Sequence, residues 1–513
     1  MSTSKESSSP VNEIEDRHFR TDHLKADIAR RTARGGLATI VSQGLKFFLS
    51  TAATVILARL LTPQDYGLIG MMAVIVNFVS MFKDLGLATA TIQKEQIGDK
   101  QISTLFWFNV VLSLGVFVFT VAIAPLVSWF YGDARLTWIT AVYAIGFVFG
   151  GLAVQHEALL RRQMRFLSLA IVEVVSLLVG ISVAIVLAWR GLHYWALIFS
   201  QLGQGLSYTI GVWIVCRWRP GLPVRGSGVR SMLVFGRNLT GFGVVNYFAR
   251  NLDNLLIGKF WGTQQLGLYA KAYQLLLLPI EQINTPIAAV AIPALSRLND
   301  DPERYRQAYL RILEKIAILT MPGTALMIVT ADWIVQIVLG PQWKEASRIF
   351  ALLGIAGLIQ PIANTTGWLF MTQSRTHHMF QWGLIGSTMI IISIVAGLPW
   401  GAVGVATSYA VTFDLVVVPA LFWFVGRTGP VRARDFYVTI IPFAAAAICS
   451  MLVLFLFRNL VVVSNPVVGI GVSFMITVGV SLLVLVVIPR GRKALRDFRQ
   501  IASLMLHKKQ VSF

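Results

Sequence analysis

Charged and amide side chains recur at helical spacing inside long apolar stretches of this chain. The stretch 36–60 carries polar residues at i, i+4, i+7, i+11 and i+15, namely Thr39, Gln43, Lys46, Ser50 and Thr54. Such a stripe predicts a water-filled cavity or a polar seam between helices, because a charge that faces lipid is costly. Both alternatives stay open for Lys46, which lies too deep to reach the interface easily.

A second cluster lies in the stretch 232–257, where Asn246, Arg250 and Asp253 follow one another at i, i+4 and i+7. Arg250 and Asp253 could form a structural ion pair that allows the helix to insert. Alternatively, Arg250 binds phosphate and exchanges partners with Asp253. Arg237 falls on another face of the same helix, where an interfacial role competes with substrate binding.

The stretch 266–293 presents Lys271, Gln274, Glu281 and Thr285 on one face, with Pro279 and Pro286 beside Glu281. Broken backbone at membrane depth is tolerated where neighbours or water satisfy the freed groups. We therefore expect Lys271 and Glu281 to face a cavity.

Two isolated carboxylates are candidates for ion coupling. Glu173 shares a face with Ser176 and Gly180, and Asp414 is close to the centre of its apolar stretch with no local partner. Asp414 could carry a coupling proton or cation, or it could be a protonated acid that is hydrogen-bonded to a neighbouring helix. The two cysteines, Cys216 and Cys449, have no metal-ligand spacing, so we expect no metal site.

Composition places these stretches in a membrane. The chain has 513 residues, is 56% hydrophobic and 13% charged, and has a mean hydropathy of +0.68. Soluble domains carry about twice that charged fraction. The net charge of +20 does not indicate nucleic-acid binding, because roughly three quarters of Lys and Arg fall in alternate loops and the tails, as the positive-inside rule requires.

Hydropathy predicts an all-α membrane protein with about fourteen transmembrane helices. The expected spans are 36–60, 66–91, 103–127, 136–157, 166–189, 194–216, 232–257, 266–293, 309–330, 346–371, 379–398, 401–425, 437–457 and 466–488. Pro322 and Gly323 are expected to interrupt the region 309–345. An even number of spans places both basic tails in the cytoplasm.

An internal repeat organises the spans. The segment 62–68 (TPQDYGL) is echoed by 262–268 (GTQQLGL), and 191–196 (GLHYWA) is echoed by 397–402 (GLPWGA). This predicts two pseudo-symmetric six-helix lobes and two further helices. The expected organisation is a cytoplasmic tail (1–35), an N-lobe (36–220), a C-lobe (221–430), two helices (431–489) and a basic tail (490–513).

The chain resembles the polysaccharide transporter family, the Wzx-type flippases of the multidrug/oligosaccharidyl-lipid/polysaccharide (MOP) superfamily. The resemblance rests on 57–67 (LARLLTPQDYG), 82–87 (FKDLGL), 251–258 (NLDNLLIG) and 266–269 (LGLY). It implies translocation of undecaprenyl-pyrophosphate-linked oligosaccharide across a bacterial inner membrane. It also implies a MATE-like fold with two lobes around a polar, partly cationic cavity that works by alternating access.

Two other functions compete with this one. A MATE-like drug or cation antiporter would have the same lobes, but an anionic substrate suits the basic residues Lys46, Arg250 and Lys271 better. A membrane polysaccharide polymerase or ligase would need an outer catalytic loop, and every predicted outer loop is short. No Walker-type phosphate loop occurs, and we expect no cofactor. The expected partners are the lipid-linked oligosaccharide, the bilayer and possible polymerase and co-polymerase proteins.

Overall fold

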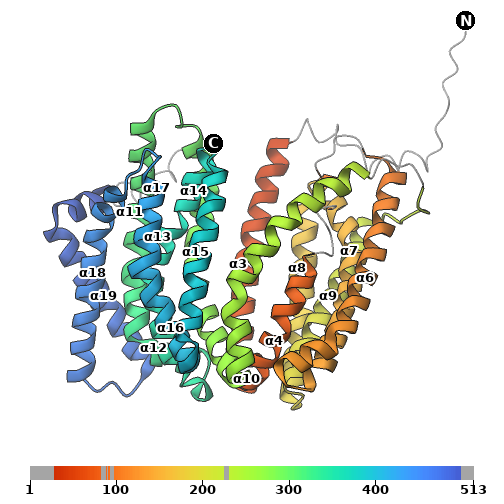
Figure 1. The fold of residues 1–513 in the computed structure, drawn as a ribbon, viewed down its shortest axis with the longest axis horizontal. Helices are drawn as coiled ribbons and strands as arrows, with labels where there is room; N and C mark the ends of the chain where they lie inside the picture. Colours follow the sequence, from red (N-terminus) through yellow and green to blue (C-terminus); the bar gives the residue numbers. More distant parts are fainter. Residues whose placement is uncertain (1–27, 82–87, 89–90, 93–96, 225–229, 498–513) are drawn as a thin grey trace, which may run out of the picture. The chain divides into compact units, whose positions relative to one another are not determined.

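The structure is a computed structural model that describes residues 28–81, 88, 91–92, 97–224 and 230–497. Side chains of 28–35, 37–38, 230–246 and 248–250 lie outside the description. Every regular element in the described residues is helical (Figure 1). The main helices are α3 (Ile28–Leu60), α4 (Pro63–Ser80), α6 (Asp99–Tyr131), α7 (Arg135–Arg162), α8 (Phe166–Trp189), α9 (Tyr194–Cys216), α10 (Arg230–Ser296), α11 (Pro302–Val329), α12 (Ala331–Val338), α13 (Ala346–Asn364), α14 (Thr366–Thr372), α15 (Thr376–Gly397), α16 (Gly401–Thr412), α17 (Val418–Gly426), α18 (Ala433–Leu460) and α19 (Pro466–Val487).

These helices confirm the all-α membrane fold. Ten helical segments of the described chain are long and apolar enough to cross a membrane, and every predicted span overlaps a helix. The spans 232–257 and 266–293 both fall within α10, where Gly262 breaks the helical backbone with φ 77° and ψ −172°. The left-handed φ favours glycine at this position.

The expected interruption at Pro322 and Gly323 is wrong, because α11 runs through both residues to Val329. Proline removes one backbone donor from a helix. In a membrane-spanning helix the remaining backbone groups have no water to bond instead, so the helical bonds on either side are retained.

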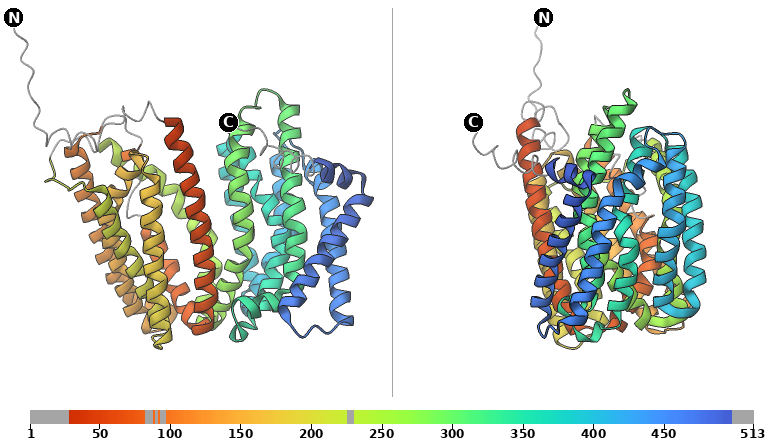
Figure 2. Two further views of the ribbon diagram at one scale, coloured as in Figure 1. Left: turned by 180° about the vertical axis from the view of Figure 1, so that it is seen from behind. Right: turned by 90° about the vertical axis from the view of Figure 1, so that its left-hand side faces the viewer.

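The chain divides into two compact units, residues 1–251 and 252–513. In the first unit α6 packs on α7, α8 on α9, and α3 on α8. In the second, α11 packs on α13 and α18, and α18 packs on α19. The long helices of each unit run side by side (Figures 1 and 2). The predicted domain limits at 220 and 430 stay predictions.

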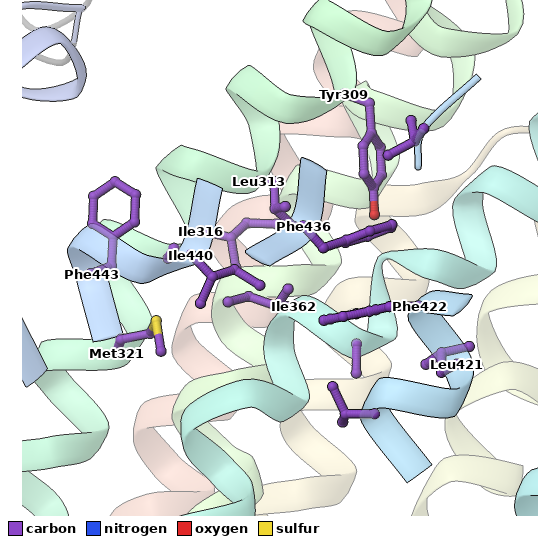
Figure 3. Packing of buried hydrophobic residues seen from close by; sticks show 14 of the residues in the cluster. Tyr309, Leu313, Ile316, Met321, Ile362, Leu421, Phe422, Phe436, Ile440 and Phe443 are labelled. Atoms are coloured by element: carbon purple, nitrogen blue, oxygen red, sulfur yellow. The ribbon is translucent and has the colours of Figure 1, made fainter. Parts of the chain in front are cut away.

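An aromatic core holds the second unit together. Phe422 of α17 stacks on Phe436 of α18 with ring centroids 4.3 Å apart, and Tyr309 of α11 meets Phe436 edge-on (Figure 3). All three side chains are fully buried. Aromatic pairs of this kind contribute beyond their buried area, so α11, α17 and α18 are firmly fixed to one another.

In each unit, a hydrogen bond joins the two echoed segments or a residue directly beside them. In the first unit, the Asp65 carboxylate accepts a hydrogen bond from the Tyr194 backbone N–H at 3.1 Å. In the second, the Trp261 indole N–H donates to the Leu398 carbonyl at 2.7 Å. In each unit, a residue at the junction of the first two spans is therefore hydrogen-bonded close to the start of the sixth predicted span, as expected for an internal repeat.

Candidate functional site

A polar cavity of about 550 Å³ lies between α3, α8 and α9 of the first unit. The cavity is open rather than sealed, and the membrane-spanning parts of the three helices that line it are mainly apolar. Its lining residues are Lys46, Ser50, Glu173, Ser176, Leu177, Gln201, Gln204, Gly205 and Tyr208. Amides, hydroxyls and one charge of each sign can bind both a sugar and an anion.

An ion pair crosses this cavity. The Lys46 ammonium lies 2.5 Å from Glu173 Oε2, and the two side chains keep 22% and 26% of their exposure. Arg161 of α7 is 4.0 Å from the other Glu173 oxygen and 2.8 Å from Glu157. The four side chains therefore form a row of alternating charge. Such pairing makes charges tolerable inside a membrane protein.

A second chamber of about 290 Å³ adjoins the first, and Gly205 and Tyr208 line both. Its walls include Gly146, Gly150, Gly151 and Glu157 of α7. Small residues let helix backbones approach closely in membranes. A Cβ built on Gly151 would lie 2.4 Å from the Ser113 hydroxyl, so glycine is required there.

The third wall of the cavity is formed by α9, none of whose residues is among the candidates predicted from the sequence. Gln201, Gln204 and Tyr208 of α9 recur at i, i+3 and i+7, the same helical spacing that identified Lys46. Tyr143 of α7 donates its hydroxyl hydrogen to the Gln201 carbonyl oxygen at 2.9 Å, which orients the amide. The sequence of α9 therefore carries the same kind of polar stripe as the stretch 36–60.

The structure brings together two residues that were predicted for separate roles. Lys46 was expected to bind substrate and Glu173 to couple ions, but they are direct partners. Ser50 of the same stripe lines the cavity, whereas Gln43 is exposed on α3 outside it. The stripe thus faces the cavity only in its middle part.

The predicted residues of α10 are described in part. The side chains of Arg237, Asn246 and Arg250 lie outside the described residues, so the Arg250–Asp253 pair stays a prediction. Asp253 is buried and accepts hydrogen bonds from the Tyr269 hydroxyl at 2.9 Å and the Asn254 N–H at 2.8 Å.

Lys271 and Glu281 lie further along α10. Lys271 donates to the Gln274 side chain at 3.0 Å, and Glu281 is exposed. Lys46 and Glu173 balance each other's charge in the described lining of the first cavity, so the predicted cationic excess depends on Lys271 and the arginines of α10. That part of the prediction stays open.

Asp414 lies in the second unit, in a π-helical turn at Phe413–Val417. One of its carboxylate oxygens is buried and meets no hydrogen-bond donor among the described residues. π-Helical turns are frequent at functional sites. The coupling role of Asp414 stays a prediction.

Known proteins share both the sequence pattern and the fold. The sequence model of a family described as polysaccharide biosynthesis protein matches residues 56–348, which is more than half of the chain. The lipopolysaccharide biosynthesis protein WzxC of Escherichia coli (strain K12) is 27% identical over 73% of this chain and 76% of its own length. The teichuronic acid biosynthesis protein TuaB of Bacillus subtilis (strain 168) is 26% identical over 65% and 70%.

The fold is also that of a solved membrane protein. The lipid II flippase MurJ in an inward closed conformation superposes with a TM-score of 0.69 over 88% of this chain and 98% of its own, at 15% identity. At this identity the likeness shows the fold alone. The family model, which covers more than half of the sequence, assigns the chain: it belongs to the polysaccharide biosynthesis protein family.

Proposed function

We propose that this protein is a flippase that carries lipid-linked oligosaccharides across the bacterial inner membrane. The observation that carries the proposal is the polar cavity inside the apolar first unit, lined by a cation, a carboxylate, amides and hydroxyls. A lipid-linked sugar needs all of these groups, because its pyrophosphate takes cations and its hydroxyls take amides and carboxylates. Family membership and the flippase fold support the same function.

Lys46 would bind the phosphate in this scheme. When the cavity is empty, Lys46 is neutralised by Glu173. An entering phosphate competes for Lys46, and Glu173 then keeps Arg161 as its partner. Gln201, Gln204 and Tyr208 contact the sugar hydroxyls. Opening of the cavity alternately to each side would move the head group while the lipid tail stays in the bilayer.

The same proposal includes the carrier lipid, the orientation of the tails, the partner proteins and further binding residues. The carrier lipid is undecaprenyl pyrophosphate, both tails are cytoplasmic, and a polymerase with its co-polymerase receives the product. Arg237, Asn246, Arg250, Asp253, Lys271 and Glu281 are proposed to complete the binding surface. Asp414 is proposed to couple an ion.

The competing functions are less well supported. The relatives are named for polysaccharide biosynthesis, so a drug antiporter would depart from the family. The cavity carries one carboxylate that is already paired with a lysine, whereas an antiporter for cationic drugs needs free acidic groups. A polymerase or ligase would be an enzyme, and the flippase fold favours transport.

The test follows the lipid-linked repeat unit in a deletion strain. Without this gene, we expect surface polysaccharide to be lost and repeat units to collect in the inner leaflet, out of reach of a periplasmic probe. The native gene should restore export, whereas Lys46→Ala or Arg250→Ala should not, at normal protein abundance. Repeat units that reach the outer leaflet at the normal rate in the deletion strain would overturn the proposal.

A further inference from the structure

A basic pocket of about 500 Å³ lies at one end of the second unit, apart from the cavity described above. It is enclosed by the first turns of α11, the first turns of α18 and the segment that follows α19. Five of its lining residues are basic and two are acidic: Arg306, Arg432, Arg434, Arg490 and Lys493 against Glu314 and Asp435.

Most of this positive charge is not neutralised by the protein. Arg306 is satisfied, because its guanidinium makes two hydrogen bonds to Asp435 at 2.5 Å and 2.9 Å. The other four basic side chains of the pocket form no ion pair with any described residue, and all four are exposed. Glu314 is the only other acid in the lining, so the pocket keeps a cationic excess.

A proline in α18 positions one of the arginines of the pocket. Pro442 has no N–H, so the Val438 carbonyl four residues earlier lacks its helical donor. Arg490 supplies the missing hydrogen bond at 3.1 Å, which holds its guanidinium against α18. A proline in α18 thus fixes an arginine that follows α19.

The segment after α19 is fixed by packing as well. A Cβ on Gly491 would lie 2.4 Å from the Leu485 carbonyl oxygen, so the chain turns back tightly at this glycine. Ala494 is 2% exposed, and its carbonyl accepts a hydrogen bond from Lys315 of α11 at 3.4 Å. Lys493 lies between Gly491 and Ala494, so packing on both sides fixes its backbone.

We propose that this pocket binds the phosphate of an anionic phospholipid head group. Arginine forks match phosphate oxygens, and basic pockets between helices at a membrane surface bind such head groups. Two apolar side chains close in sequence to lining residues are exposed: Ile441, which precedes Pro442, at 59%, and Val487, three residues before Arg490, at 75%. Acyl chains would cover these side chains, which a soluble phosphate could not do.

The proposal is tested by native mass spectrometry of the full-length protein, delipidated and then titrated with phosphatidylglycerol, cardiolipin or phosphatidylethanolamine. We expect selective retention of the two anionic lipids. The triple variant R434Q/R490Q/K493Q should bind them on the order of 100-fold more weakly, from roughly fivefold for each cation removed. The double variant R434Q/K493Q, which keeps the Arg490–Val438 bond, should bind roughly 25-fold more weakly.

The matched control is R311Q/R492Q/R496Q, which removes three exposed arginines of α11 and the C-terminal segment outside the pocket. It should bind anionic lipid almost as the native protein does. Equal loss in both triple variants would mean a diffuse basic surface and would overturn the proposal. Displacement by millimolar inorganic phosphate with no preference for lipid, or retention of a polyprenyl pyrophosphate instead of phospholipid, would overturn it as well.

Discussion

The Lys46–Glu173 pair allows a structural role to be separated from a role in transport. Lys46→Gln and Glu173→Gln each remove one charge while keeping length and hydrogen-bonding capacity. The double variant removes both charges and leaves a neutral pair. Lys100→Gln, an exposed lysine of α6, is the matched control for a lost positive charge.

The structure predicts unequal costs for the two single variants. Glu173 retains Arg161 at 4.0 Å when Lys46 is removed, and this interaction supplies roughly three fifths of the attraction at 2.5 Å by inverse distance. Lys46 has no comparable second carboxylate among the described ion pairs. The pair is half-buried, so breaking it should cost more than breaking an exposed ion pair and less than breaking a buried one. We expect the free energy of unfolding to fall by about 2 kcal/mol in Glu173→Gln and by about 1 kcal/mol in Lys46→Gln.

Thermal unfolding of the purified protein measures the structural role of the pair, and export of polysaccharide in cells measures its role in transport. The double variant should regain stability, because no unpaired charge remains. Its export should stay at least roughly tenfold low, because the charge-assisted bond to phosphate is still missing. Normal export by the double variant would refute substrate binding by Lys46. Equal destabilisation by the two single variants would refute the compensation by Arg161.

Two further predictions concern stability. Tyr269→Phe should lower the free energy of unfolding by about 1–2 kcal/mol, because the buried Asp253 loses its side-chain donor; an unchanged unfolding temperature would contradict this. Gly151→Ala should destabilise the first unit by about 1–3 kcal/mol through the clash with Ser113. Gly115→Ala on the same helix pair meets open space and should be neutral or slightly stabilising.

The helices and the repeat could be predicted from the sequence, because both depend on local pattern. Apolar length marks a span by itself, and the echoed segments at 62–68 and 262–268 needed only comparison along the chain. Lys46 could also be identified, since a lysine within an apolar helix requires a polar neighbour. The identity of that neighbour could not be predicted.

The other site residues could not be predicted, because they are brought together by contacts between distant parts of the chain. Glu173 is 127 residues from Lys46 in the sequence, and only the packing of α3 on α8 joins them. The basic pocket likewise collects residues from Arg306 to Lys493, each of which by itself is an ordinary charge near the end of a span. The stripe of Gln201, Gln204 and Tyr208 was accessible to the same reasoning as Lys46. Its side chains are uncharged and therefore give a weaker signal than Lys46, because a charge is costlier inside a membrane.

The distance between Lys46 and Glu173 along the chain has a consequence for synthesis. α3 is the least apolar of the ten candidate spans and leaves the ribosome first. At about 5–20 residues per second, the 127 residues up to Glu173 take roughly 6–25 seconds to appear. During this interval, the insertion machinery or lipid phosphates must hold a lysine-bearing helix that has no partner. Slowed translation between α3 and α8 should therefore increase degradation of the nascent chain, and Lys46→Gln should relieve it.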